Sequence, residues 1–437
     1  MKKIFVTIGI SKKLASNIGI LFIANLSNNG VAFLINMLIA RSFSHAEYGE
    51  FAIATNIAVT LQTIAELGIN LSMVRLYKER QNDSTKSSAL ILWSLIFKIS
   101  EITLIFLVWH FFQDPIVSLL TSESSNKTIL YYAVATAGFL LIWEFLKALF
   151  QAKENFKKIG TLTLLYSLFR AALIISLYHA DSPDINNIFI ATYIAPLAPL
   201  LIYGLFTSLR SIELNNHSIY LIKRVEVEYL NYSKWIALGG ISFTVSQSAM
   251  IFMTSHFRDL KSVSLISAGL VFTTIFNLFN TSATQVLFPK VSSLKINDIA
   301  IYRNKLYKIL PIMLLTGLTL IGVFSSIMYF ILGSKYQEAL PIFWITGVNN
   351  ILVTWLGFYS IVLHSIKRPD IAGRISFISM LLFIIGAYFI LSNPSLGIIS
   401  LVSYYAATTL FFELLKRAFI SKTLRSLSSP ATSLIDH

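Results

Sequence analysis

The chain alternates between long apolar runs and short polar segments. Residues 262–289, 309–332, 339–366 and 375–412 contain no Asp, Glu, Lys or Arg, and the polar stretch SNPS at 392–395 divides the last of these runs in two. About 20 consecutive apolar residues are enough for a helix to cross a bilayer. The pattern therefore predicts membrane-spanning helices rather than the buried helices of a large soluble enzyme.

Twelve such spans are predicted from the apolar runs and the polar corners between them. They are residues 14–41, 46–77, 88–112, 128–152, 159–179, 188–209, 229–257, 262–289, 306–332, 339–364, 371–391 and 394–416. Pro196 and Pro199 remove backbone donors within the sixth of these spans, so we expect a kink there.

The predicted fold class is an all-α integral membrane protein of two six-helix bundles, because the longest inner loop, residues 210–229, divides the spans six and six. The corner at residues 41–51 has a weaker echo at 256–266, 215 residues later. Such a repeat is typical of duplicated transporters that handle substrate between two halves. The predicted parts are a tail at 1–13, a bundle at 14–210, a linker at 211–228, a bundle at 229–417 and a tail at 418–437.

Composition and charge agree with a membrane protein. Of 437 residues, 55% are hydrophobic and 13% charged, and the mean hydropathy is +0.69, whereas about a quarter of a soluble domain is charged. Of 35 Lys and Arg residues, 27 fall in the predicted inner segments, five in the outer segments and three within spans. This asymmetry places both termini in the cytoplasm. It also argues against a nucleic-acid partner, because the net charge of +14 is spread over seven inner segments.

Two smaller features complete this picture. No small-residue cleavage site precedes the first span, so residues 1–13 are expected to be a short tail or an interfacial helix rather than a signal peptide. The sequence has no cysteine, which excludes disulfides and thiolate metal sites.

Ionisable residues within the spans are the main candidates for function, because each costs roughly 2.5–3.5 kcal/mol at the bilayer centre on insertion scales. All lie in the first half of the chain: Glu66, Lys98, Glu101, Glu144, Lys147 and Arg170. Arg170 is near the middle of the fifth span, with no acidic residue three or four positions away. A guanidinium binds phosphate through a planar fork of donors, so Arg170 is the leading candidate for contact with a pyrophosphate. The alternative is a packing ion pair with Glu66 or Glu144.

Lys98 and Glu101 are three residues apart on one predicted helix, as are Glu144 and Lys147 on the next. Lys98 and Glu144 are expected at similar depth, so an ion pair between the third and fourth spans is a structural alternative to cargo contact or proton coupling. Such pairs can also exchange partners between two conformations.

Other polar residues have two readings each. Glu66 is a candidate for binding a coupling ion, or it stabilises a helix turn beside Gly68. Arg41 is either a snorkelling anchor or a cargo ligand. The asparagines of the first span offer donors and acceptors to sugar hydroxyls, or bond neighbouring helices; they are Asn25, Asn28, Asn29 and Asn36.

The sequence contains no phosphate loop, no metal-ligand spacing and no nucleophile triad, and its seven histidines are scattered. We therefore expect no enzymatic activity, no metal and no bound cofactor. Energy for transport is expected from a gradient of H+ or Na+, or from consumption of the cargo outside.

Four short motifs resemble those of the multidrug/oligosaccharidyl-lipid/polysaccharide exporter superfamily. They are FSHAEYGEF at residues 43–51, ELGI at 66–69, FPKVS at 288–292 and QA at 151–152. Within this superfamily the chain is similar to the polysaccharide repeat-unit flippases, the O-antigen transporter group. The echo of the first motif departs from the pattern, because Ser264 stands where glycine is usual.

This resemblance implies a V-shaped pair of bundles that opens alternately to each side of the inner membrane. The implied cargo is an undecaprenyl-pyrophosphate-linked oligosaccharide, moved from the cytoplasmic to the periplasmic leaflet. A polysaccharide polymerase and a chain-length regulator are implied as further partners, beside the lipid bilayer.

Two other functions remain open. A cation-coupled multidrug exporter of the same superfamily is the first alternative, although acidic residues alone would suit such a cavity better than an Arg and two Lys. The second is a multi-span polymerase or glycosyltransferase. Those enzymes usually carry a large outer catalytic loop, and here the longest predicted outer loop is near residues 113–127.

Overall fold

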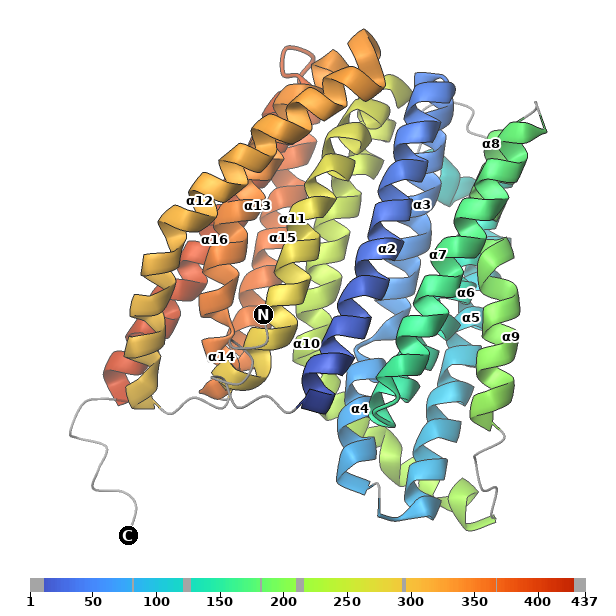
Figure 1. The fold of residues 1–437 in the computed structure, drawn as a ribbon, viewed down its shortest axis with the longest axis vertical. Helices are drawn as coiled ribbons and strands as arrows, with labels where there is room; N and C mark the ends of the chain where they lie inside the picture. Colours follow the sequence, from blue (N-terminus) through green and yellow to red (C-terminus); the bar gives the residue numbers. More distant parts are fainter. Residues whose placement is uncertain are drawn as a thin grey trace. The chain divides into compact units, whose positions relative to one another are not determined.

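The computed structural model describes residues 12–80, 82–120, 127–180, 183–209, 216–292, 296–366 and 368–427. Every regular element in these ranges is a helix (Figure 1). This confirms the all-α class, and each of the twelve predicted spans coincides with one helix or a pair of consecutive helices. The ends of the predicted tails, residues 1–11 and 428–437, lie outside the described residues.

The chain forms two compact units, which we call unit 1 (Met1–Ala237 with Asp259–Ser264) and unit 2 (Leu238–Arg258 with Leu265–His437). The division lies inside α10 (Asn216–Phe257), a helix that begins within the predicted linker. Unit 1 otherwise contains α2 (Lys12–Ser42), α3 (His45–Glu66), α4 (Ile69–Arg80), α5 (Ser84–Leu120), α6 (Lys127–Ala152), α7 (Phe156–His179), α8 (Ile185–Thr192) and α9 (Ile194–Leu209).

Helix α6 is the centre of unit 1, since it contacts α3, α4, α5, α7, α8 and α9. Its side chains Phe145, Leu146 and Leu149 are almost fully buried in an apolar cluster with Leu197 of α9. A Cβ at Gly204 of α9 would lie 2.7 Å from Leu146 Cδ1, so glycine permits the close approach of these two helices. Helix α2 packs along α7 on another side of the unit.

The corner motif at residues 43–51 has a structural explanation. Ser44 caps α3, and its hydroxyl and backbone N–H exchange hydrogen bonds with Glu47 in a capping box. A Cβ at Gly49 would lie 2.6 Å from the carbonyl oxygen of Leu260, so only glycine fits without a shift. The motif is therefore a cap followed by a point of close backbone contact.

The same corner contacts the segment that echoes it in sequence. His45 Nδ1 lies 2.7 Å from Ser264 Oγ, and Gly49 packs on Leu260. The 215-residue offset equates His45 with Leu260 and Gly49 with Ser264. Both contacts lie within unit 1, and the alignment of the repeat stays a prediction.

Unit 2 contains most of α11 (Leu260–Ser292), then α12 (Ile296–Leu332), η1 (Gly333–Ala339), α13 (Leu340–Ser360), α14 (Val362–Ser365), α15 (Pro369–Ser392) and α16 (Ile398–Leu427). Helix α16 packs against both α13 and α15. Phe358, Val362, Leu363 and Ile420 form one buried cluster of this unit.

Among the residues that the structure describes, ten helical stretches are long and apolar enough to cross a membrane. One of them, residues 301–360, includes both α12 and α13, and α3 is not among the ten. The expectation of one continuous helix over 46–77 is wrong. Leu67 and Gly68 adopt φ of 48° and 70°, and this left-handed pair separates α3 from α4.

Candidate functional site

Arg170 lies in the middle of α7 with only 4% of its surface exposed. Its Nη2 donates to the backbone oxygen of Asn28 at 2.7 Å and to Asn28 Oδ1 at 3.1 Å. Asn28 belongs to α2, so the packing of α2 along α7 brings the two residues together although 142 positions separate them. The guanidinium is thus held by two neutral acceptors.

Tyr166 supports Arg170 from one turn earlier on α7. The guanidinium carbon lies 4.9 Å from the centre of the Tyr166 ring, within the range of a cation–π contact. The Tyr166 hydroxyl donates to the carbonyl oxygen of Thr192 at 3.1 Å. That carbonyl has no helical donor, because the residue four positions later is Pro196.

The kink expected in the sixth span is confirmed by this geometry. Helix α8 ends at Thr192, Tyr193 has φ −122° and ψ −62°, and α9 begins at Ile194 (Figure 1). The Tyr193 hydroxyl donates to Thr55 Oγ1 at 3.3 Å and its ring stacks on Phe51. Arg170 is therefore linked to the α8–α9 break through Tyr166.

Arg170 has no acidic partner among the described residues, where no carboxylate oxygen lies within 4.0 Å of it. The ion pair with Glu66 or Glu144, considered from the sequence, is not formed. Its Nε atom is buried and has no hydrogen-bond acceptor among the described residues. One edge of the guanidinium fork is thus unsatisfied.

The other five ionisable residues that were predicted within the spans lie on α3, α5 and α6. Lys98 is fully buried and its Nζ lies 2.8 Å from Glu101 Oε2. Lys147 Nζ lies 2.7 Å from Glu144 Oε1, and both of these side chains are about one-third exposed. The ion pair between Lys98 and Glu144 that was considered from the sequence is not formed, because each residue pairs with the neighbour three positions away on its own helix.

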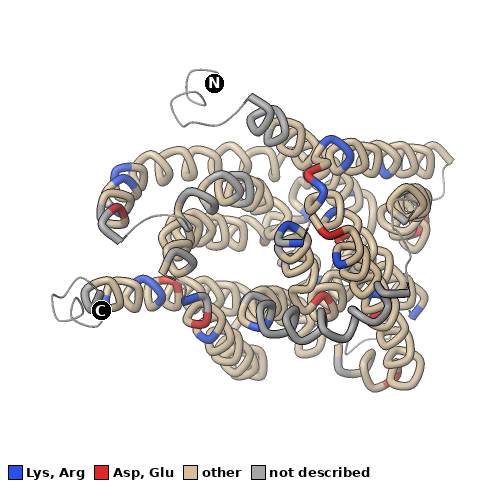
Figure 2. The backbone as a smooth tube through the Cα atoms, turned by 90° about the horizontal axis from the view of Figure 1, so that it is seen from below, with Lys and Arg blue, Asp and Glu red and all other residues tan. Residues whose placement is uncertain are grey.

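Glu66 forms a charge cluster with these four residues. It is the last residue of α3, just before the left-handed pair, and lies within electrostatic range of Lys98, Glu144 and Lys147. Three carboxylates and two ammonium groups are therefore close together. Glu101 Oε1 is buried without a hydrogen-bond partner among the described residues. Most of the described backbone carries uncharged residues, and the charged ones occur on many helices (Figure 2).

The other predicted site residues lie apart from this cluster. Asn36 Nδ2 donates to Ala32 O in its own helix at 2.9 Å. Asn25 is half-buried, Asn29 is exposed, and Arg41 is exposed in the last turn of α2. Asn36 therefore satisfies its own helix, while the sugar-binding and anchoring roles of the other three stay predictions.

Two features were missed from the sequence. Tyr166 could have been found, since it precedes Arg170 by four residues and shares its helix face. In unit 2, Glu413 accepts from Lys416 Nζ at 2.6 Å and from Ser360 Oγ at 3.1 Å. This pair borders a cavity of about 80 Å³ that is also lined by hydroxyl groups, among them those of Ser242, Ser246, Tyr405 and Thr409. Within the described ranges, no three His, Asp or Glu side chains are grouped so as to hold a metal ion.

Solved structures with the same fold are transporters. The chain is similar to "Lipid II flippase MurJ, inward closed conformation" with a TM-score of 0.71 and 18% identity, over 92% of this chain and 87% of that one. It is similar to an inward-facing "multidrug resistance MATE family transporter of the MOP superfamily" with a TM-score of 0.72 and 13% identity, over 93% and 96%. A mutant of the Vibrio cholerae MATE transporter VcmN gives a TM-score of 0.62 and 17% identity, over 95% and 99%.

Sequence comparison gives the family. No curated protein matches the chain. A sequence model described as "Polysaccharide biosynthesis protein" matches residues 14–295, which is more than half of the chain. The chain is a multi-pass membrane protein with the fold of the exporter superfamily named above, and it belongs to the polysaccharide biosynthesis protein family.

Proposed function

We propose that this protein is a flippase for lipid-linked oligosaccharide. Its cargo is an undecaprenyl-pyrophosphate-linked repeat unit, such as that of O-antigen, moved across the bacterial inner membrane to the periplasmic leaflet by alternating access. Both termini lie in the cytoplasm, as the distribution of Lys and Arg favours. The family membership and the transporter fold support this function.

The observation that carries the proposal is the state of Arg170. A buried guanidinium within a membrane span is costly unless it has a use, and the partners that it has among the described residues, Asn28 and Tyr166, are neutral. Hydrogen bonds from a guanidinium to phosphate oxygens are roughly twice as strong as neutral ones. A pyrophosphate that reaches α7 therefore displaces Asn28 favourably, and the free Nε edge offers it a second donor.

The test replaces Arg170 in cells that make the polysaccharide. Arg170→Ala is expected to abolish surface polysaccharide and to leave lipid-linked repeat units in the inner leaflet, with the protein still present in the membrane. Arg170→Lys should recover part of the activity, because it keeps the charge and loses the fork.

A matched control is Arg258→Ala in unit 2. Arg258 Nη2 also donates to two neutral acceptors, Asn393 O at 2.8 Å and Leu396 O at 2.7 Å. This variant should keep most of the surface polysaccharide. Normal polysaccharide in Arg170→Ala contradicts the assignment, and drug sensitivity with unchanged polysaccharide after gene deletion favours the multidrug exporter.

We also propose that the charge cluster couples transport to an ion. Glu66, Glu101 and Glu144 exceed Lys98 and Lys147 by one negative charge, and one H+ or Na+ neutralises this excess. A net charge is costly inside the bilayer, so a cluster without net charge can change its surroundings during transport at a lower cost. The same ion can thus be bound in one conformation and released in the other.

This coupling is tested with Glu66→Gln, Glu101→Gln and Glu144→Gln in vesicles carrying a pH or sodium gradient. At least one variant should make the transport rate independent of the gradient, with a loss of about tenfold in rate, equivalent to roughly 1.4 kcal/mol. Glu413→Gln in unit 2 is the control and should respond as the unchanged protein does. A response to both gradients in all three variants overturns the coupling site.

A further inference from the structure

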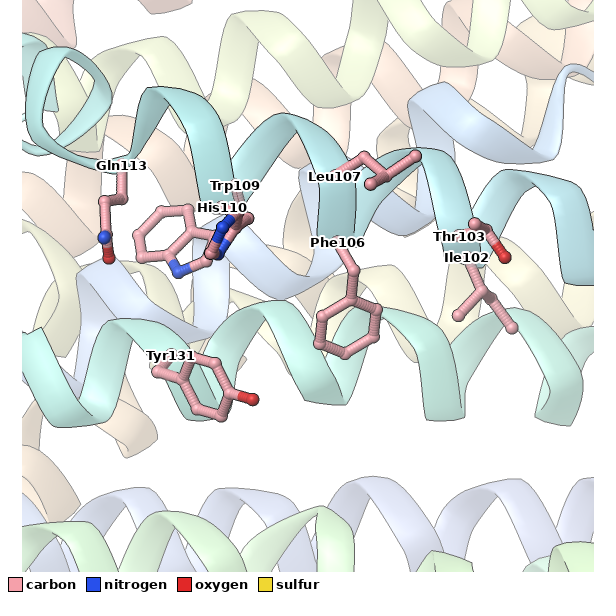
Figure 3. Close-up of a pocket in the computed structure, with 8 residues that line it drawn as sticks. All are labelled: Ile102, Thr103, Phe106, Leu107, Trp109, His110, Gln113 and Tyr131. Carbon is pink, nitrogen blue, oxygen red and sulfur yellow. The ribbon is translucent and has the colours of Figure 1, made fainter.

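A groove runs between α5 and α6 of unit 1, with a volume of about 480 Å³. Figure 3 shows Ile102 and Phe106 of α5 directed toward the helix that carries Tyr131. Its lining residues are Ile102, Thr103, Phe106, Leu107, Trp109, His110, Gln113 and Tyr131. None of these residues belongs to the site described above.

The lining changes from apolar to polar along α5. Ile102, Phe106 and Leu107 form the apolar part, and His110 and Gln113 follow one to two turns later. Helix α5 bends at this polar part, since Phe112, between His110 and Gln113, has φ −123° and ψ 17°, and Pro115 follows within the helix. Trp, Tyr and polar groups gather where hydrocarbon meets headgroups. The groove therefore spans the boundary between lipid tails and headgroups of one leaflet.

Trp109 carries a donor that the protein does not satisfy. The residue is 6% exposed, and its Nε1 has no acceptor among the described residues. Two other tryptophans do have acceptors: Trp344 Nε1 donates to Ser325 Oγ at 2.8 Å and Trp355 Nε1 to Leu306 O at 2.9 Å. A buried indole N–H normally has a partner, and a membrane interior supplies no water in its place.

Two residues of opposite charge adjoin the lining in sequence, because Asp114 follows Gln113 and Lys127 lies one turn before Tyr131. Lys127 Nζ at the start of α6 lies 2.9 Å from Asp114 Oδ1 of α5, and their side chains are 70% and 73% exposed. Exposed pairs of this kind are weak. The Lys127 ammonium and the Asp114 carboxylate can therefore rotate to form ion pairs with a ligand that carries the opposite charges.

We propose that this groove binds a zwitterionic phospholipid with an ethanolamine headgroup. Its acyl chain lies along Ile102 and Phe106, and an ester or phosphate oxygen accepts from Trp109 Nε1–H once the exposed His110 and Gln113 side chains move aside. Lys127 pairs with the phosphate and Asp114 with the ammonium. An anionic phospholipid fits less well, because it leaves Asp114 beside a phosphate without a counter-charge.

Native mass spectrometry of the full-length protein tests this site with phosphatidylethanolamine and phosphatidylglycerol of identical acyl chains. The unchanged protein should retain phosphatidylethanolamine in preference. Trp109→Phe, which keeps an aromatic ring and removes the N–H, should weaken that retention about fivefold, as expected for one hydrogen bond. The matched control Trp344→Phe removes an indole that the protein itself satisfies and should leave retention unchanged.

Two surface variants examine the headgroup separately and do not depend on how Trp109→Phe folds. Asp114→Asn and Lys127→Gln should each remove the preference for phosphatidylethanolamine. Equal retention of both lipids by the unchanged protein overturns the proposal, as does identical behaviour of Trp109→Phe and Trp344→Phe. These measurements involve no glycan, so their outcome is separate from that of the proposed flippase activity.

Discussion

Units 1 and 2 treat charge within the membrane differently. In unit 2, Glu413 is partly exposed and both of its oxygens accept a hydrogen bond, one from Lys416 and the other from Ser360. In unit 1, Glu101 keeps one buried oxygen without a partner among the described residues. A charge whose bonds are complete stabilises a helix bundle. A charged side chain with an unused hydrogen-bonding atom can bind a ligand or an ion.

The largest difference is expected when the lysine of each ion pair is removed. Lys98→Met leaves Glu101 buried beside an apolar side chain, and breaking a buried pair in this way costs about 3 kcal/mol. Lys416→Met should cost only about 1 kcal/mol, because Glu413 keeps Ser360 and its pair is partly exposed. Thermal unfolding of each purified variant in detergent measures the two losses.

A second variant shows whether this loss comes from the stranded carboxylate. Lys98→Met combined with Glu101→Gln removes both charges, so most of the stability should return. Equal losses in Lys98→Met and Lys416→Met would show that the two units do not differ in this respect.

Sequence patterns predicted the contacts made within one helix better than those made between helices. Residues three apart on a helix are neighbours whatever the fold, and Lys98–Glu101 and Glu144–Lys147 pair in this way. The expected pair of Lys98 with Glu144 depends on how two helices are rotated about their axes. Depth along the helix, which the sequence does give, does not fix that rotation.

The difference between features of one helix and contacts between helices also applies to the helix breaks and to Arg170. Pro196 marked the break between α8 and α9, because a missing N–H is a property of the residue itself. The break after Glu66 was missed although Gly68 was visible, because Leu67 shares the left-handed conformation, which is unusual for leucine. Arg170 stood out in the sequence, but its partner Asn28 follows only from the packing of α2 on α7.

A smaller effect separates two tyrosines that make the same bond. Tyr166 donates to Thr192 O in unit 1 at 3.1 Å, and Tyr302 donates to Phe358 O in unit 2 at 2.9 Å. Interhelical hydrogen bonds in membranes average about 0.6 kcal/mol, so Tyr166→Phe and Tyr302→Phe should lower the unfolding temperature by similar small amounts.

Transport should distinguish these two variants. Tyr166 lies under the guanidinium of Arg170 and holds the α8–α9 break, so Tyr166→Phe should reduce surface polysaccharide at unchanged protein level. Tyr302 contacts neither, and Tyr302→Phe should leave the polysaccharide amount as it is. Equal polysaccharide in the two variants would remove Tyr166 from the site.

The smallest expected effect concerns a charge of unit 1 outside the membrane spans. Asp83 caps α5: its Oδ1 accepts from the backbone N–H of Lys86 at 3.0 Å, and its Oδ2 lies 2.9 Å from Lys86 Nζ. The backbone hydrogen bond from Lys86, and then the bond from its side chain, lower the pKa of Asp83 below its ordinary value of 3.8.

A lowered pKa in the folded state has a definite sign. The carboxylate contributes its stability above the ordinary value of 3.8, and that contribution is lost as the pH falls through the lowered folded value. Asp83→Asn keeps a capping oxygen without the charge. Its unfolding temperature should therefore lie slightly below that of the unchanged protein at pH 7. The difference should shrink below pH 3.8 and vanish once the pH is below the lowered folded pKa of Asp83. A difference that persists in acid would mean that the cap, not the charge, is what the substitution disturbs.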